Sequence, residues 1–311
     1  MIKTLNKGGI GTLLIGICLV ALTKYIPITK GLALSQINWP ELVLFGVLLI
    51  IQGIWFQRLI HNARFFEFTS VVPFILYLVV TLSLPSQLNR FIPLMVNFVF
   101  LIFYQKLFYP RDRDQVDRQI FIEAGLLTGI FIILDPKLII TVPFILIMLN
   151  QFVASSFNRT LLVFLSTLVL LISYLSIIFF VYGMERIDGF LNDITYHIDY
   201  ESVTAPGNLY PYLIYVLSAF LIAIPVYRQL AYMQNMKRYI INILYLQILF
   251  FGLVAIFAGE SFHLSLQYLT LPIAFILSFG LQHMKSRWLQ NVVVLFFLFA
   301  LIFTQIVYQL P

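Results

Sequence analysis

Long apolar runs recur along the whole chain and are separated by short polar segments. A helix needs about 20 apolar residues to cross a hydrocarbon layer about 30 Å thick. The pattern therefore predicts an all-α, polytopic transmembrane protein with about eleven spans. The predicted spans are residues 8–26, 40–57, 66–84, 91–109, 119–135, 137–154, 160–182, 209–227, 239–258, 266–283 and 288–309.

The fifth and sixth predicted spans are short, and only Asp135, Pro136 and Lys137 separate them. Two interpretations fit this spacing: a pair of tilted spans, or a helical hairpin that turns within the membrane interface. The first run follows Lys3 and Lys7 as a signal peptide would, but it lacks the small-residue cleavage pattern. We interpret it as an uncleaved first span.

The basic residues predict the orientation of these spans. With a cytoplasmic N-terminus, fourteen of the nineteen Lys and Arg residues fall in cytoplasmic segments, as the positive-inside rule requires. This alternation predicts an inner-membrane protein with its N-terminus inside and its C-terminus outside. The outer segments then carry eight of the thirteen carboxylates: Glu41, Asp135, Glu185, Asp188, Asp193, Asp199, Glu201 and Glu260. We therefore expect acidic chemistry on the outer face.

Composition supports a single integral membrane domain over residues 1–311. Apolar residues make up 61% of the chain and charged residues 10%, which excludes a soluble fold. The net charge of +6 follows from the cytoplasmic loops and does not indicate a nucleic-acid partner. Cys18 is the single cysteine, so the chain forms no intramolecular disulfide and no cysteine-based metal cage.

The outer polar loop 183–208 stands out in this apolar chain. It holds five of the thirteen carboxylates, together with Tyr196, His197 and Tyr200. Most other aromatic residues lie near span ends and fit an interfacial belt. Acids interleaved with aromatic rings also suit a sugar-binding surface, so this loop is a candidate lid or acceptor-binding segment.

Two further segments have a structural and a functional interpretation. Residues 24–40 are too apolar for a plain loop and too short to span, which favours an interfacial helix on the outer leaflet. Glu41 follows, and its carboxylate suits the N-terminal turn of the next helix. The charged run 109–118 is interpreted as a solvated cytoplasmic loop, with docking of a partner or of anionic headgroups as the alternative.

The fifth predicted span carries an ionisable residue and a pair of glycines. Glu123 lies one turn into the span, where Arg118 or water can satisfy its charge. Gly125 and Gly129 form a small-xxx-small pair, which allows two helices to approach closely. We expect this span to pack tightly against another helix.

Several enzyme classes lose support from the sequence. No phosphate-binding loop, dinucleotide fingerprint, HExxH motif or GxSxG motif is present. A four-histidine iron site is disfavoured, because His61 and His283 are predicted inside while His197 and His263 are predicted outside. Charges at mid-helix are scarce and no repeat is evident, which disfavours an ion-coupled transporter.

The segment 123–149, EAGLLTGIFIILDPKLIITVPFILIML, resembles a pattern of membrane glycosyltransferases of the GT-C superfamily. The resemblance implies a polyprenyl-phosphate-linked sugar as donor, an active site at the outer leaflet, and a catalytic acid in the first outer loop, which follows the first span. Residues 24–40 contain no Asp or Glu, which departs from the family pattern. The catalytic candidates are therefore Asp135 and Glu41.

The resemblance also suggests which residues would bind the donor and the acceptor. The candidates for binding phosphate or substrate are Arg90, Lys137, Arg186, His197 and Glu260. No cofactor is predicted, since the activation energy is stored in the lipid-linked sugar. A divalent metal remains an open alternative, held by Asp135 with loop carboxylates.

The C-terminal run 269–297, LTLPIAFILSFGLQHMKSRWLQNVVVLFF, has a proline-containing helix, a basic turn with Trp288 and a final helix. Together with the glycine-bearing fifth span, it makes the chain similar to a family of polytopic inner-membrane proteins of Bacteroidota, which implies no particular function. Two rivals to the glycosyltransferase hypothesis therefore stay open. The first is a non-enzymatic membrane subunit or scaffold of a cell-envelope complex, with a partner protein and membrane lipids as ligands. The second is an O-antigen-polymerase-like enzyme. Such enzymes usually rely on arginines of a large outer loop, and this alternative fits less well because Arg186 is the single basic residue of the long outer loop here.

Overall fold

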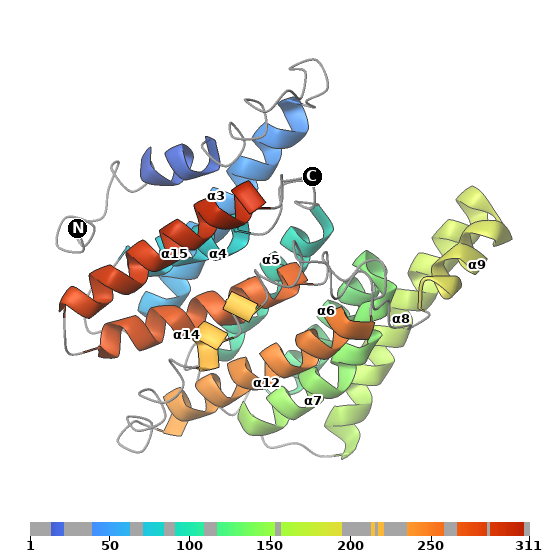
Figure 1. Ribbon diagram of the computed structural model, residues 1–311. Coiled ribbons are helices and arrows are strands. Elements are labelled where there is room, and N and C mark those ends of the chain that lie inside the picture. The colour runs from blue at the N-terminus through green and yellow to red at the C-terminus, as the bar shows by residue number, and fades with distance from the viewer. Residues whose placement is uncertain are drawn as a thin grey trace.

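The computed structural model describes residues 14–21, 39–62, 71–83, 91–108, 117–152, 157–194, 213–214, 217–220, 235–257, 266–284 and 287–307. All regular secondary structure in these residues is helical. The named elements are α3 (Trp39–Asn62), α4 (Val72–Leu82), α5 (Phe91–Phe108), α6 (Asp117–Leu134), η3 (Pro136–Ile140), α7 (Thr141–Phe152), α8 (Phe157–Tyr182), α9 (Met184–Asn192), α12 (Asn235–Phe257), η5 (Leu266–Leu269), α14 (Thr270–His283) and α15 (Arg287–Val307). Figure 1 shows their arrangement.

The all-α prediction is confirmed for the described residues. Four helices within them are long and apolar enough to cross a membrane: α3, α5, α8 and α12. This indicates association with a membrane. Shorter apolar helices lie at 72–82, 136–152, 266–282 and 290–303. The eleven spans and their orientation stay predictions.

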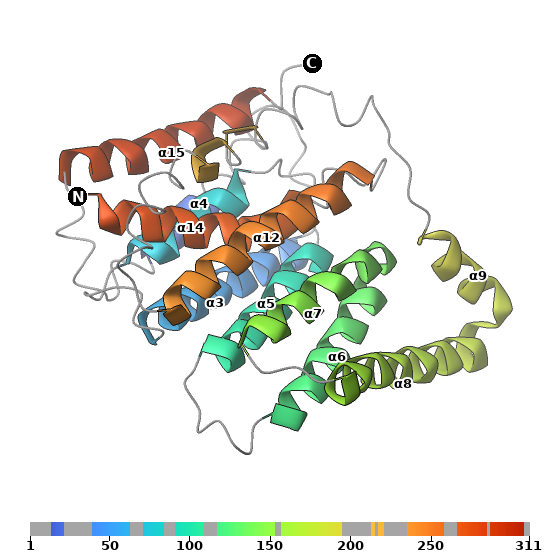
Figure 2. The same cartoon turned by 90° about the horizontal axis from the view of Figure 1, so that it is seen from below.

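Two short helices lie inside the bundle. Every residue from Pro73 to Leu82 in α4 is buried, and so is every residue from Leu266 to Leu281 across η5 and α14. Helix α14 packs against α4 and α12, and α3 packs against α4 and α5 (Figures 1 and 2). Because protein surrounds these short helices on all sides, their apolar side chains form the core.

Aromatic rings fill the space around α5. Phe100 stacks on Phe131 of α6 with ring centroids 4.2 Å apart, and meets Phe251 of α12 edge-on at 5.3 Å. Phe251 in turn contacts Tyr268 of η5 at 5.8 Å. Such ring pairs add about 0.5–1.5 kcal/mol beyond the area they bury. This line of rings connects α5, α6, α12 and η5 across the bundle.

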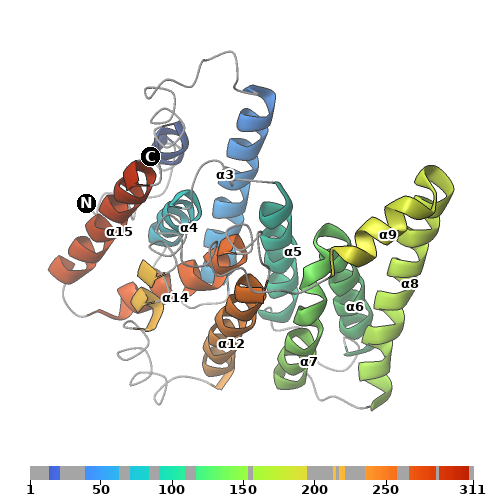
Figure 3. The ribbon, with the colours of Figure 1, turned by 45° about the vertical axis from the view of Figure 1, so that its right-hand side comes forward.

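Helices α6 and α8 form the most extensive helix–helix contact in the described part of the chain. A Cβ built at Gly125 would lie 2.4 Å from the backbone oxygen of Val163, so only glycine fits there. A Cβ at Gly129 would lie 2.8 Å from the side chain of Leu170. The prediction that these glycines allow a close approach is therefore confirmed. Figure 3 shows the two helices side by side.

Helix α8 is the most exposed of the long apolar helices, with 22% of its apolar window buried, against 56% in both α5 and α12. The side chains of Val169 and Ile172 are 62% and 61% exposed. Hydrophobic surface of this extent is unfavourable in water and suits lipid. In all three overall views α8 and α9 lie at the edge of the molecule.

The polar segment 183–208, predicted to lie on the outer face, begins with a helix that the sequence interpretation missed. Gly183 ends α8 and adopts φ +77° and ψ −171°, a conformation essentially restricted to glycine. Residues 184–192 then form α9, in which no residue is buried. The rest of this loop from residue 195, and residues 24–38 of the predicted interfacial helix, lie outside the described residues.

Candidate functional site at the Asp135 turn

The candidate site is the turn that joins α6 to α7. The amide of Asp135 donates to the carbonyl of Phe131 and closes α6, and Pro136 then occupies the first position of η3. Asp135 is the N-cap of η3, because its Oδ1 accepts a 3.1 Å hydrogen bond from the backbone N–H of Lys137. A proline at the first helical position and an aspartate before it are standard helix-start chemistry.

Asp135 also binds a segment distant in sequence. The hydroxyl of Tyr268, in η5, donates a 2.6 Å hydrogen bond to Asp135 Oδ2. Tyr268 is 1% exposed, whereas Asp135 is half-buried. The buried phenol therefore fixes the orientation of a carboxylate that keeps part of its surface accessible. An ionised carboxylate offers about four lone-pair sites, so two of them remain for another ligand.

A buried amide supports this turn from the other side. Asn97 Nδ2 in α5 donates to the carbonyl of Gln267 and to Thr270 Oγ1, at 3.0 Å each. Gln267 directly precedes Tyr268, so Asn97 positions η5 and through it the phenol. The Asp135 turn is thus held by contacts that reach α5, η5 and α14.

The remaining predicted site residues are distributed over the chain. Lys137 belongs to the same turn as Asp135 and is half-buried. Glu41 lies in the first turn of α3, with a side chain outside the described set, and Arg186 is exposed on α9. Arg90, His197 and Glu260 lie outside the described residues. The structure thus brings together Asp135 and Lys137.

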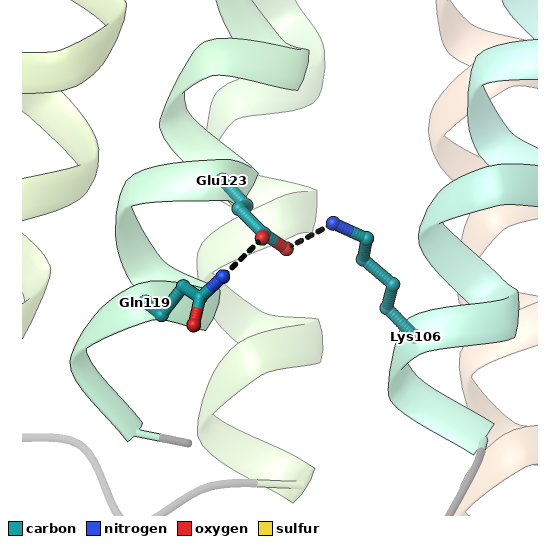
Figure 4. A network of polar contacts seen from close by, with 3 residues as sticks. All are labelled: Lys106, Gln119 and Glu123. Atoms are coloured by element: carbon teal, nitrogen blue, oxygen red, sulfur yellow. Dashed lines mark hydrogen bonds and ion pairs between the residues drawn. The ribbon is translucent and has the colours of Figure 1, made fainter. Parts of the chain in front are cut away.

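A second polar cluster lies at the opposite end of α6 from Asp135. Lys106 Nζ of α5 lies 2.5 Å from Glu123 Oε2, and Gln119 Nε2 donates to Glu123 Oε1 at 2.9 Å (Figure 4). The sequence interpretation gave Arg118 or water as the partner of Glu123. The charge is paired across two helices instead, which explains its tolerance near an apolar segment.

Helix α5 connects its neighbours through every polar side chain it carries. Asn97 binds η5 and α14, Tyr104 OH donates to Gln247 Oε1 of α12, and Lys106 binds α6. Trp55 Nε1 of α3 donates to Gln105 Oε1 at 2.7 Å. Polar side chains that bond across helices stabilise packing where no water is present. The polar groups of α5 are therefore interhelical contacts.

Tyr268 and Asn97 are site residues that sequence reasoning missed. Asn97 is a single polar residue in an apolar stretch, whereas Tyr268 lies next to Gln267 and close to Thr270; buried polar groups need a partner. That signal marks them as contact residues without naming the partner. Among the described residues, no group of three His, Cys, Asp or Glu side chains could hold a metal ion.

The helical bundle, its apolar outer surface and its paired polar groups define an α-helical membrane-associated protein. A family model matches residues 7–310, and the chain belongs to that family, described as a family of unknown function, DUF6427. Comparison with curated proteins and comparison with solved structures give no match.

Proposed function

We propose that the chain crosses the inner membrane eleven times, with its N-terminus in the cytoplasm. Two contacts agree with the relative directions of the spans in this topology, and the positive-inside bias of the sequence gives the orientation. Lys106 and Glu123 both belong to cytoplasmic helix ends in it, and Asp135 and Tyr268 both belong to outer helix ends. A mismatched topology would place contacting residues on opposite sides of a membrane about 30 Å thick.

On this basis we propose that the chain acts on lipid-linked sugars at the outer face, as a protein with a GT-C-like scaffold. One observation carries the proposal: Asp135 is half-buried and held in one orientation, with Lys137 two residues away in the same turn. A fixed carboxylate, with a lysine in the same turn, provides the two kinds of group that glycosyl transfer from a phosphate-linked donor needs.

In the proposed reaction, Asp135 accepts the proton of an acceptor hydroxyl. The acceptor oxygen bonds to the anomeric carbon, and the bond from that carbon to the phosphate oxygen breaks. The polyprenyl phosphate leaves with the bonding electrons, and Lys137 stabilises its negative charge. The carboxylate can do this while bound to Tyr268, since its remaining lone pairs are available. Glu41 is the second candidate acid.

The test uses the purified full chain in liposomes, with polyprenyl-phosphate glucose, mannose and arabinose as probes. We expect release of polyprenyl phosphate, and a fall of at least about 100-fold for Asp135→Asn, the contribution typical of general base catalysis. The asparagine side chain in this variant retains an oxygen that can accept from the Lys137 amide, so the fold should persist. Wild-type rates in both Asp135→Asn and Glu41→Gln would show that the catalytic assignment is wrong.

A second candidate is a non-enzymatic subunit of an envelope complex. The observation that favours it is the use of polar side chains: Asn97, Tyr104 and Lys106 of α5 each bond a neighbouring helix. Asp135 likewise caps η3 and accepts from Tyr268. A scaffold needs such contacts and no reactive group. Affinity purification in mild detergent tests this alternative, which expects a stoichiometric partner that Asp135→Asn does not release.

A further inference from the structure

Helix α9 has a sharply divided surface. Its apolar positions Met184, Ile187, Phe190 and Leu191, continued by Ile194, follow a helical period. At 100° per residue these five side chains cover an arc of about 120°, and the polar positions occupy the opposite side. The polar positions are Glu185, Arg186, Asp188, Gly189, Asn192 and Asp193. An apolar stripe of this kind requires an apolar environment.

The end of α8 supplies only part of that environment. The ring of Phe190 lies 5.8 Å from the ring of Tyr174 on α8. Met184 and Leu191 are 59% and 50% exposed, and so are Phe180 and Tyr182 of the last α8 turn, at 85% and 70%. The exposed stripe of α9 therefore continues the exposed apolar surface of α8.

The geometry of the turn fixes the depth of α9. Phe190 follows Gly183 by seven residues and contacts Tyr174, which precedes Gly183 by nine, so α9 turns back obliquely beside the end of α8 (Figure 3). At 1.5 Å per residue this return covers at most about 10 Å. Helix α8 has 26 residues, or about 39 Å, and exceeds a hydrocarbon layer of about 30 Å. The end of α8 thus reaches headgroup level, and α9 returns to the acyl boundary.

We propose that α9 is an interfacial helix whose apolar stripe inserts into the outer leaflet beside α8. Lipid is the occupant because the stripe continues the surface of a spanning helix at the depth where amphipathic helices lie. The acidic side then faces water and forms part of the outer surface. This inference rests on the membrane placement proposed for α8 and is independent of catalysis.

The test places spin labels on single cysteines in a Cys18→Ser chain reconstituted in phosphatidylcholine vesicles. The labelled positions are Leu191→Cys on the stripe, Asp188→Cys on the polar side, and Val169→Cys on exposed α8. Oxygen concentrates in lipid and a nickel chelate stays in water. We expect oxygen to speed spin relaxation most at positions 191 and 169, and the nickel chelate to do so most at position 188. The ratio of the oxygen effect to the nickel effect should differ at least several-fold between position 191 and position 188.

Each other result overturns the proposal in a distinguishable way. Nickel access at 191 equal to that at 188, with 169 in lipid, would place α9 in water. Protection of 191 from both reagents, with 169 in lipid, would show that protein covers the stripe. Nickel access at 169 would contradict the membrane placement of α8 itself.

Discussion

Replacement of Gly125 by alanine should separate helices α6 and α8. The added Cβ would lie 1.9 Å from Ser166 Oγ and 2.4 Å from the carbonyl oxygen of Val163. A serine side chain can rotate, but the Val163 carbonyl is part of the α8 backbone. Ordinary contact begins near 3.4 Å, so the helices must move apart by about 1 Å. Thr167 Oγ1 would lose its 2.9 Å contact with the Gly125 carbonyl and keep the one to the Val163 carbonyl within α8.

The expected net destabilisation is about 2 kcal/mol. Overpacking costs about 1–3 kcal/mol, and the rigid backbone contact places this site at the upper end. Alanine regains about 1 kcal/mol of helix propensity over glycine. The measurement is the midpoint of heat-induced loss of the monodisperse peak in mild detergent. For a chain of 311 residues, about 2 kcal/mol corresponds to a fall of about 3 °C in this midpoint.

Two matched glycine variants separate packing from propensity. Gly189→Ala in α9 introduces a Cβ with no atom within 4 Å, so its midpoint should not fall. Gly129→Ala meets the Leu170 side chain at 2.8 Å and should fall less than Gly125→Ala, because a leucine can change rotamer. A midpoint for Gly125→Ala equal to that of Gly189→Ala would refute the close-packing argument.

Three other substitutions test the polar contacts and the α8–α9 turn. Lys106→Met should lower stability in detergent by about 1 kcal/mol, and the double variant Lys106→Met with Glu123→Gln should recover most of this loss. Thermal midpoints equal to that of the wild-type chain in both variants would show that the ion pair contributes nothing. Tyr104→Phe leaves Gln247, whose Nε2 already lacks a partner, with both polar ends unpaired; we expect a loss of about 1 kcal/mol, restored by an added Gln247→Leu. Gly183→Ala should cost about 1–3 kcal/mol locally and raise protease cleavage in α9 without moving the global midpoint, whereas unchanged cleavage would contradict the strain at φ +77°.

Hydropathy predicts where the long helices lie, because bilayer-sized apolar runs dominate the sequence. The predicted span 160–182 corresponds to α8 at Phe157–Tyr182, and 266–283 corresponds to η5 and α14. Hydropathy averaged over a window the length of a span does not detect α9. Met184, Ile187 and Leu191 alternate with acids, so the mean hydropathy of the segment is low while its helical periodicity is strong. A test of periodicity would have found this helix.

Partners of polar residues are harder to predict than helices. Glu123 needs a counter-charge, and Arg118 lies nearer in sequence, yet Lys106 from α5 supplies it. Tyr268 reaches Asp135 across 133 positions. Helix packing decides such contacts, and one sequence does not reveal which helix faces are adjacent. Asp135 itself was predictable because an aspartate before proline starts a helix, whichever interpretation of the turn holds.

The two roles of Asp135 can be separated because they use different properties of the carboxylate. Capping of η3 uses Oδ1 and the bond from Tyr268 uses Oδ2, so these contacts need a polar atom at each of the two positions. General base catalysis needs a group that takes up a proton at neutral pH. Asparagine keeps the shape and one oxygen acceptor but has no basic oxygen, whereas Tyr268→Phe keeps the base and removes the orienting phenol. Loss of turnover with a normal midpoint in Asp135→Asn would therefore assign chemistry to this turn. If instead the wild-type chain shows no turnover and Tyr268→Phe lowers the thermal midpoint, the Asp135 turn would be assigned to assembly of the fold.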